Sequence, residues 1–326
     1  MDTHLNNKRI LIFLAFAIGI PWIAALVLYL SLGATDLFKA AALSNLIFIS
    51  TPALANVATR LVTREGWRRL WLWPKFRHGW PFYLAAILLP FLAAIIGGAI
   101  FYLIFPQFFD PNLGEVRKLY TPYSVADSTN PWVALLIITL LASIRWLLQN
   151  GLLSIGEEFG WRAYLLPKLM ARFTGGEPDP GSSLYVASAR KAFLLIGLIW
   201  GVWHFPLIIM GMSSDPSMTL IRVLAYLGLY VVSTCSMSVL LCWVALRSGS
   251  VWPASIGHGF INGTSALPGV LVKGTPNPLL GPGLPGLLGM LGYLALALVL
   301  LFHSRAFASR EARLESARVT EYPTLV

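Results

Sequence analysis

The stretch AFLLIGLIWGVWHFPLIIMG, residues 192–211, contains no Asp, Glu, Lys or Arg, and its one ionisable side chain is His204. A transmembrane α-helix needs about 20 consecutive, mostly apolar residues, so this stretch alone is long enough to cross a bilayer. It therefore predicts a membrane-spanning helix that carries a histidine inside the membrane.

The rest of the chain repeats this pattern. Hydrophobic residues make up 57% of the 326 residues and charged residues 12%, whereas a soluble domain carries about 25% charge. This composition excludes a disordered chain, a collagen, a coiled coil and an ordinary cytosolic enzyme. We expect an all-α, polytopic membrane protein with eight transmembrane helices, which form a single integral-membrane domain over residues 1–326. The eight stretches lie at about 10–32, 38–62, 80–105, 132–155, 192–211, 219–246, 252–272 and 283–303.

Basic residues recur in every second connection between these stretches. They occupy segments 8–9, 60–77, 162–191, 247 and 305–318, and the other connections are poorer in Lys and Arg. Basic loops face the cytosol, so the pattern predicts a multi-pass protein with both termini cytosolic. The net charge of +10 sits between apolar runs. It therefore indicates topology and contact with anionic membrane lipids, and we expect no nucleic-acid partner.

One basic connection is also rich in tryptophan. The segment WRRLWLWPKFRHGWPF, residues 67–82, mixes aromatic rings with Arg and Lys. Such a segment suits an interfacial anchor, with the rings at headgroup level and the cations outside the membrane. A partner-binding role is the alternative.

Ionisable and polar side chains inside apolar stretches are costly, and they mark functional sites. The chain has fourteen acidic residues. Twelve of them lie in predicted loops, tails or helix ends, and the other two are an adjacent pair at the cytosolic end of the fourth predicted span. The predicted topology brings three helices together in the cytosolic half of the membrane, where this pair can meet the intramembrane histidines. The candidate residues are Glu157, Glu158, Arg162, His204, His258 and Asn262.

The two carboxylates differ in their helical neighbours. Glu158 and Arg162 are four residues apart and share a helix face, so their ion pair keeps Glu158 ionised. Glu157 points about 100° away around the helix and lacks this partner. Glu157 is therefore the better general base and Glu158 the structural residue. A solvated salt bridge at a helix end is the plain alternative for Glu158 and Arg162.

The histidines lie on two further helices. His258 and Asn262 are also four residues apart, and two donors on one face can stabilise a developing oxyanion. His204 can bind the same water as Glu157, or a metal ion. An intramembrane histidine can also simply bond the backbone of a neighbouring helix.

A cation lies near the middle of the fourth predicted span. Arg145, with Gln149 and Asn150 beside it, is expected either to line the external side of the active cavity or to pair with a loop carboxylate. The candidate carboxylates are Asp110, Glu115 and Asp127.

Three motifs carry a resemblance to a known family. EEFGWR at 157–162 resembles the EExxxR motif of the CPBP family, the CAAX-protease and bacteriocin-processing enzymes also called Abi proteins. WGVWH at 200–204 resembles its FxxxH motif, with Trp200 where Phe is usual, and HGFIN at 258–262 matches HxxxN. The motif-bearing core, about 132–272, thus carries the resemblance, and predicted helices 1–3 and 8 are peripheral.

The resemblance implies an intramembrane endopeptidase similar to the type II prenyl-protein (CAAX) protease. In that family the residue at Glu157 activates water with the help of the residue at His204. His258 and Asn262 take the positions of the oxyanion hole. Glu158 and Arg162 are the remaining motif positions. The substrate implied is a membrane-associated protein or peptide, and a lipidated, CAAX-like one by analogy with one branch of the family.

Two alternatives stay open at this point. The sequence has no HExxH motif, but zinc could be held by His204, His258 and a glutamate, Glu157 or Glu158, as in a metalloendopeptidase. We favour the cofactor-free mechanism because Asn262 beside His258 suits an oxyanion site better. The other alternative is a non-enzymatic protein, such as a transporter, a scaffold or a bacteriocin self-immunity protein. The sequence shows none of the internal repeats of many transporters, which favours the enzyme.

Overall fold

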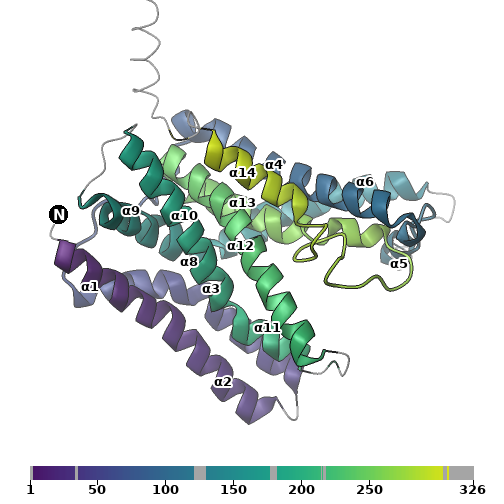
Figure 1. Cartoon of the computed structure of the whole chain (residues 1–326), viewed down its shortest axis with the longest axis horizontal. Coiled ribbons are helices and arrows are strands. Elements are labelled where there is room, and N and C mark those ends of the chain that lie inside the picture. Colours follow the sequence, from purple (N-terminus) through teal and green to yellow (C-terminus); the bar gives the residue numbers. More distant parts are fainter. Residues whose placement is uncertain are drawn as a thin grey trace, which may run out of the picture.

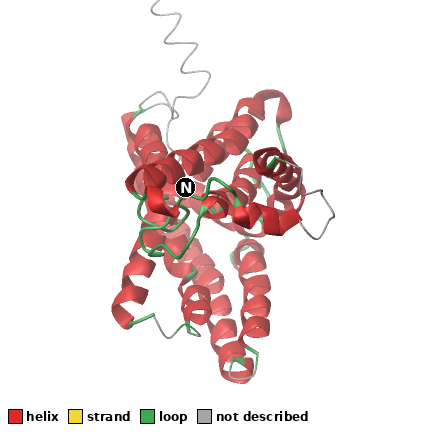
Figure 2. Cartoon of the chain, turned by 90° about the vertical axis from the view of Figure 1, so that its right-hand side faces the viewer, coloured by secondary structure: helices red, strands yellow, loops and turns green. Residues whose placement is uncertain are grey.

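The computed structural model describes residues 3–33, 36–120, 130–176, 182–213, 215, 218–303 and 307. These residues form helices joined by loops (Figure 2). The basic C-terminal residues Arg305, Arg310, Arg313 and Arg318 lie outside the described residues, as does Asp127.

Most of the described chain is α-helix, interrupted by short π-helical and 3₁₀ turns (Figure 1). The elements are α1 Thr3–Leu14, η1 Ala15–Gly19, α2 Ile20–Leu32, α3 Leu37–Val62, α4 Phe76–Ile104, η2 Pro106–Phe108, α5 Gly114–Tyr120, α6 Pro131–Arg145, η4 Trp146–Asn150, α7 Gly151–Leu153, α8 Ile155–Gly160, η5 Trp161–Leu165, α9 Leu166–Thr174, α10 Ser183–Trp203, α11 Phe205–Met212, α12 Leu220–Ser248, α13 Trp252–Thr264, η6 Leu267–Leu271 and α14 Leu291–Phe302.

Six continuous helical segments among the described residues are long and apolar enough to cross a membrane. The chain is therefore an all-α, multi-pass integral membrane protein. The six segments are His4–Leu32, Leu37–Val62, Phe76–Ile104, Pro131–Thr174, Ser183–Met212 and Leu220–Ser248.

The described residues contain six such segments where the sequence predicted eight, because the helices in the last two predicted spans are shorter than expected. The stretch predicted at 252–272 folds as α13, of 13 residues, followed by the short η6. The stretch predicted at 283–303 keeps helix only in α14, of 12 residues. Twelve residues of helix reach about 18 Å, against a hydrocarbon core of about 30 Å. Glycines and prolines between 274 and 289 prevent the helix from extending towards its N-terminus.

The fourth span is longer than predicted. The sequence indicated 132–155, but helix continues from Pro131 to Thr174. Two π-helical turns, η4 and η5, interrupt it. Glu157 and Glu158 therefore lie inside this helix and not at its end. Single π-turns are common at functional sites, and η5 contains Arg162.

The helices pack as a bundle in which the motif-bearing segments are central. Figure 1 shows α1 and α2 in line along one side, beside α3, while α4 and α14 lie along the other. Between them, α10 packs against α12, α12 against α13, and α13 against α4. The segment α8 packs against α3 and also contacts α13. This arrangement brings the three motifs to the interior of the protein.

Glycine pairs allow these helices to approach closely. A Cβ on Gly197 would lie 2.4 Å from the Cα atom of Cys235 on α12, and one on Gly156 would lie 2.3 Å from the carbonyl oxygen of Ile49 on α3. Small residues four apart are typical of close helix contacts in membranes. Each motif-bearing helix carries such a pair, with one glycine inside the motif and the other outside it: Gly156 and Gly160, Gly197 and Gly201, and Gly259 and Gly263.

Candidate active site

Glu158 lies at the centre of a buried charged cluster. Its Oε1 atom accepts hydrogen bonds from Nη1 of Arg162 at 2.9 Å and from Nδ1 of His258 at 2.8 Å. The side chains of Glu158 and Arg162 are fully buried, and that of His258 is 4% exposed. The helical spacing of four therefore produces the expected ion pair, and the tertiary fold adds a partner one hundred residues away.

Glu157 faces a different helix. Its Oε2 atom accepts a hydrogen bond from the indole Nε1–H of Trp200 on α10, at 2.8 Å. It makes no ion pair with Arg162 among the described contacts. The two adjacent carboxylates thus have separate surroundings, one bound to a cation and a histidine and the other to a neutral donor.

His204 is held by the backbone of its own helix. Its Nδ1 atom lies 2.8 Å from the carbonyl oxygen of Trp200. A carbonyl oxygen can only accept a hydrogen bond, so Nδ1 carries the proton. In the neutral imidazole, Nε2 then presents a lone pair. That nitrogen can accept a proton from water or bind a metal ion.

Trp200 connects all of these groups, and sequence reasoning missed its role. Its ring centroid lies 5.1 Å from that of His258 and 5.5 Å from that of His204. The guanidinium of Arg162 stacks over the same ring at 5.0 Å. The signal was present in the sequence, where Trp replaces the usual Phe of the motif. A buried indole N–H needs an acceptor, which the carboxylate of Glu157 provides, and phenylalanine has no such donor.

A second aromatic residue borders the site. Tyr230, on α12, has its ring centroid 5.2 Å from that of His204, and it interacts electrostatically with Glu157. It belongs to no motif, and only the packing of α10 against α12 places it here.

Asn262 lies outside this network of contacts. It is exposed, and it lines a cavity of about 340 Å³ together with Arg145 and Asn150. Arg145 therefore shares a cavity with Asn150. Among the described residues, its proposed partners have other contacts: Asp110 accepts from the backbone of Gly114, and Glu115 pairs with Lys118.

The zinc alternative requires three ligands to converge. Within the described residues, no group of three or more His, Cys, Asp or Glu side chains is arranged to hold a metal ion. The Nδ1 atom of His258 is directed at Glu158, and that of His204 at a backbone carbonyl. These hydrogen bonds leave both Nε2 atoms open, as they are in metal-binding histidines, but no three such side chains converge among the described residues, so we derive no step through a metal.

Comparison with known proteins identifies the same region. Residues 128–264 match the model of the family described as type II CAAX prenyl endopeptidase Rce1-like. A protein named CAAX prenyl protease 2, from Methanococcus maripaludis, is 32% identical over 108 residues. The aligned part is 32% of this chain and 34% of that protein, so the chain spans about a third of the length of the curated relative.

The matched segment contains all three motifs and every contact described for the candidate site. Residues 128–264 are therefore similar to the Rce1-like type II CAAX prenyl endopeptidase family, and the three motifs resemble those of the CPBP proteins.

Proposed function

We propose that this protein is an intramembrane endopeptidase that hydrolyses a peptide bond of a membrane-associated substrate. The observation that carries the proposal is the separation of the two adjacent carboxylates. Glu158 is fully buried between Arg162 and His258, whereas among the described residues the carboxylate of Glu157 has only the neutral Trp200 as a hydrogen-bond partner. A carboxylate without a cationic partner retains the basicity that a general base needs.

The proposed reaction uses one water molecule. Glu157 takes a proton from this water as its oxygen attacks the scissile carbonyl carbon, and the Nε2 lone pair of His204 orients the water. The carbonyl π electrons move to oxygen, and the resulting oxyanion accepts a hydrogen bond from Nε2–H of His258. Asn262 lines a different cavity in this structure, so its side chain would have to turn towards the site to act as the second donor. The tetrahedral intermediate then collapses, the C–N bond breaks, and the proton on Glu157 passes to the departing amine.

Glu158 and Arg162 have a supporting role in this scheme. With Nδ1 of His258 bound to Glu158, only Nε2 can face the substrate. A neighbouring carboxylate favours the doubly protonated imidazole, whose Nε2–H is the donor that an oxyanion requires. The bond from Arg162 fixes the carboxylate of Glu158 in the position from which it holds His258.

We also infer the orientation of the protein and the class of its substrate. The basic ends of the helices support an arrangement with both termini cytosolic and the site in the cytosolic half of the bilayer. The family description supports a protein or peptide substrate, and the name of the relative suggests a prenylated CAAX-like one.

The test is cleavage of a prenylated CAAX peptide by the purified protein in liposomes. Glu157→Gln keeps the shape of the side chain but cannot take a proton, so we expect a loss of about 10²-fold or more in kcat. Glu115→Gln, in an exposed pair with Lys118, serves as the matched control and should keep full activity. Equal activity in Glu157→Gln and wild type would refute the proposal, and a transporter or scaffold would show no cleavage at all.

The same assay separates the two mechanisms. Activity of the wild type should survive thorough treatment with a chelator, since Glu157 and His204 activate the water directly. If chelation abolished activity and zinc restored it, His204 and His258 would have to be reassigned as ligands, with a glutamate completing the site.

A further inference from the structure

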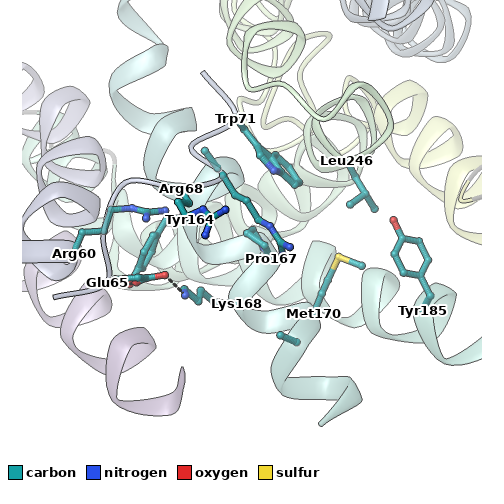
Figure 3. A pocket seen from close by; sticks show the side chains of 13 residues that line it. Arg60, Glu65, Arg68, Trp71, Tyr164, Pro167, Lys168, Met170, Tyr185 and Leu246 are labelled. Carbon is teal, nitrogen blue, oxygen red and sulfur yellow. Dashed lines mark hydrogen bonds and ion pairs between the residues drawn. The ribbon is translucent and has the colours of Figure 1, made fainter. Parts of the chain in front are cut away.

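A second cavity, of about 350 Å³, lies where several helices end on one side of the bundle (Figure 3). Arg60 comes from the end of α3, Lys168 from α9, Tyr185 from the start of α10 and Leu246 from the end of α12. The loop between α3 and α4 covers it. Three of these are C-terminal ends of the second, fourth and sixth candidate spans and one is the N-terminal end of the fifth, so all lie on the same side of the bundle and the cavity lies at the membrane surface.

The cavity carries an excess of positive charge. Its lining contains four cations and a single carboxylate, that of Glu65. This carboxylate is already engaged: it pairs with Lys168, accepts a hydrogen bond from Tyr164 at 3.0 Å, and lies 3.3 Å from Arg9. The cations lining the cavity are Arg60, Arg68, Arg69 and Lys168.

Two of these cations are buried at the cavity. Arg60 and Lys168 are each only 5% exposed. Arg60 donates through Nε to Asn56 and through Nη1 to the carbonyl of Gly66, and its second terminal nitrogen has no hydrogen-bond partner among the described residues. Burying cations in excess over acids is costly unless an anion compensates them. The charge and burial therefore favour an anionic ligand.

The other half of the cavity is apolar. Figure 3 shows Arg60, Glu65 and Lys168 on one side, and Tyr185 and Leu246 on the other. Trp71, Pro167 and Met170 complete the apolar lining. A ligand that matches both halves has an anionic group joined to an apolar part.

The covering loop is strained and fixed in place. Arg69 and Trp71 both have φ 56°, in the left-handed region that non-glycine residues rarely adopt. The carbonyl of Trp71 accepts a hydrogen bond from the amide of Val251 at 2.9 Å. Exposed tryptophans on the same loop, Trp67 and Trp73, suit a segment at the level of lipid headgroups.

We propose that this cavity binds the phosphate-bearing headgroup of an anionic phospholipid. The phosphate contacts Arg60 and Arg68, and the glycerol and first acyl carbons lie against Trp71 and Leu246. Basic cavities between the ends of transmembrane helices are suited to such headgroups. The site is separate from Glu157 and does not depend on the proposed peptidase activity.

Binding can be measured directly on the full chain in a neutral detergent. The probes are dioctanoyl phosphatidylglycerol, dioctanoyl phosphatidylcholine and inorganic phosphate, with Kd determined by native mass spectrometry. We expect phosphatidylglycerol to bind at least about tenfold more tightly than either of the others, because only it matches both halves of the cavity.

Variants locate the bound lipid. Arg68 is exposed, so Arg68→Gln should leave folding intact. It should weaken the binding of phosphatidylglycerol about tenfold, whereas Arg68→Lys should keep most of the affinity. The matched control is Arg77→Gln, which removes an exposed arginine of the same segment outside the cavity. The melting temperature of each variant verifies that it is folded.

Several results would overturn the assignment. Equal affinity for phosphatidylglycerol and phosphatidylcholine would show that no anion is selected. Equal weakening by Arg68→Gln and Arg77→Gln would indicate general surface attraction. Inorganic phosphate binding as tightly as the lipid would define a site for soluble anions. Displacement of the lipid by an unprenylated peptide with a free C-terminal carboxylate would assign the cavity to a peptide.

Discussion

Trp200 holds two proposed catalytic residues through different atoms. Its indole N–H binds Glu157, and its backbone carbonyl binds His204. The first contact depends on the side chain and the second does not. A substitution at this position therefore tests the orientation of Glu157 separately from that of His204.

Trp200→Phe should lower kcat by roughly tenfold with little change in KM. The phenyl ring preserves most of the packing and the carbonyl that fixes His204, but Glu157 loses its hydrogen-bond donor, a contact worth about 1–3 kcal/mol to a charged acceptor. The kcat and KM of peptide cleavage provide the measurement, and the pH dependence of kcat should change as well. A variant with wild-type kcat and pH profile would show that the indole of Trp200 contributes only to packing and that its hydrogen bond to Glu157 does not affect catalysis.

At the scale of the elements, close contact between helices determines where the motifs meet. The helix α10 approaches α12 at Gly197, and the fourth span approaches α3 at Gly156. A side chain at either position would separate the backbones and move the motif carried on that helix. Glycine is therefore required here for space and not for its backbone conformation.

Gly197→Ala should destabilise the protein by about 1–3 kcal/mol, since the new Cβ would lie 2.4 Å from the backbone of Cys235. Gly211→Ala is the matched control, because nothing lies within 4 Å of its new Cβ. That control should leave the melting temperature unchanged or slightly raised, as alanine favours helix. Identical melting temperatures for the two variants would contradict the close packing of α10 and α12.

Glu65 links three elements through its carboxylate and should make stability depend on pH. Burial by itself opposes ionisation of Glu65, but the hydrogen bond and charge of Lys168, with the charge of Arg9, hold the pKa of the carboxyl below its ordinary value of 4.5. The lowered pKa means that this stabilisation is fully present above pH 4.5 and is lost as the pH falls through the folded-state pKa.

Glu65→Gln should therefore lower the melting temperature near neutral pH, by an amount equivalent to about 1 kcal/mol, and the difference from wild type should shrink under acid conditions. Thermal unfolding at a series of pH values measures this. The exposed Glu115→Gln should show no comparable difference. A gap between Glu65→Gln and wild type that widened towards acid pH would reverse the predicted sign.

For the whole molecule, the alternation of charge along the six candidate spans makes a definite prediction of topology. Basic residues gather at one set of helix ends, where Arg77 and Lys191 lie, and are sparser at the other, where Lys118 and Lys273 lie. Translocation retains basic loops on the cytosolic side.

Single cysteines introduced into a cysteine-free background test this orientation in intact cells. A membrane-impermeant thiol reagent should label Lys118→Cys and Lys273→Cys directly. Arg77→Cys and Lys191→Cys should be labelled only after permeabilisation. All four positions are exposed, so the comparison reports sidedness. Labelling of Arg77→Cys in intact cells would reverse the proposed orientation and place the candidate site in the other half of the bilayer.

The sequence by itself determined the features that depend on local spacing and composition. Apolar length predicted an all-α membrane protein, and six of the predicted spans correspond to long helices. The spacing of four predicted the pairing of Glu158 with Arg162, because residues one helical turn apart are neighbours whatever surrounds them. The three short motifs at 157–162, 200–204 and 258–262 likewise indicated the resemblance to the CPBP family.

Only the tertiary structure decided which distant groups meet. The contact of His258 with Glu158 joins residues one hundred positions apart, and the bond from Trp200 to Glu157 depends on how two helices pack. The tertiary structure also places Asn262 in the lining of a cavity with Arg145 and Asn150, which its spacing of four from His258 does not predict. Helix periodicity determines directions about one axis, whereas contacts between helices depend on close packing by residues far apart in the chain.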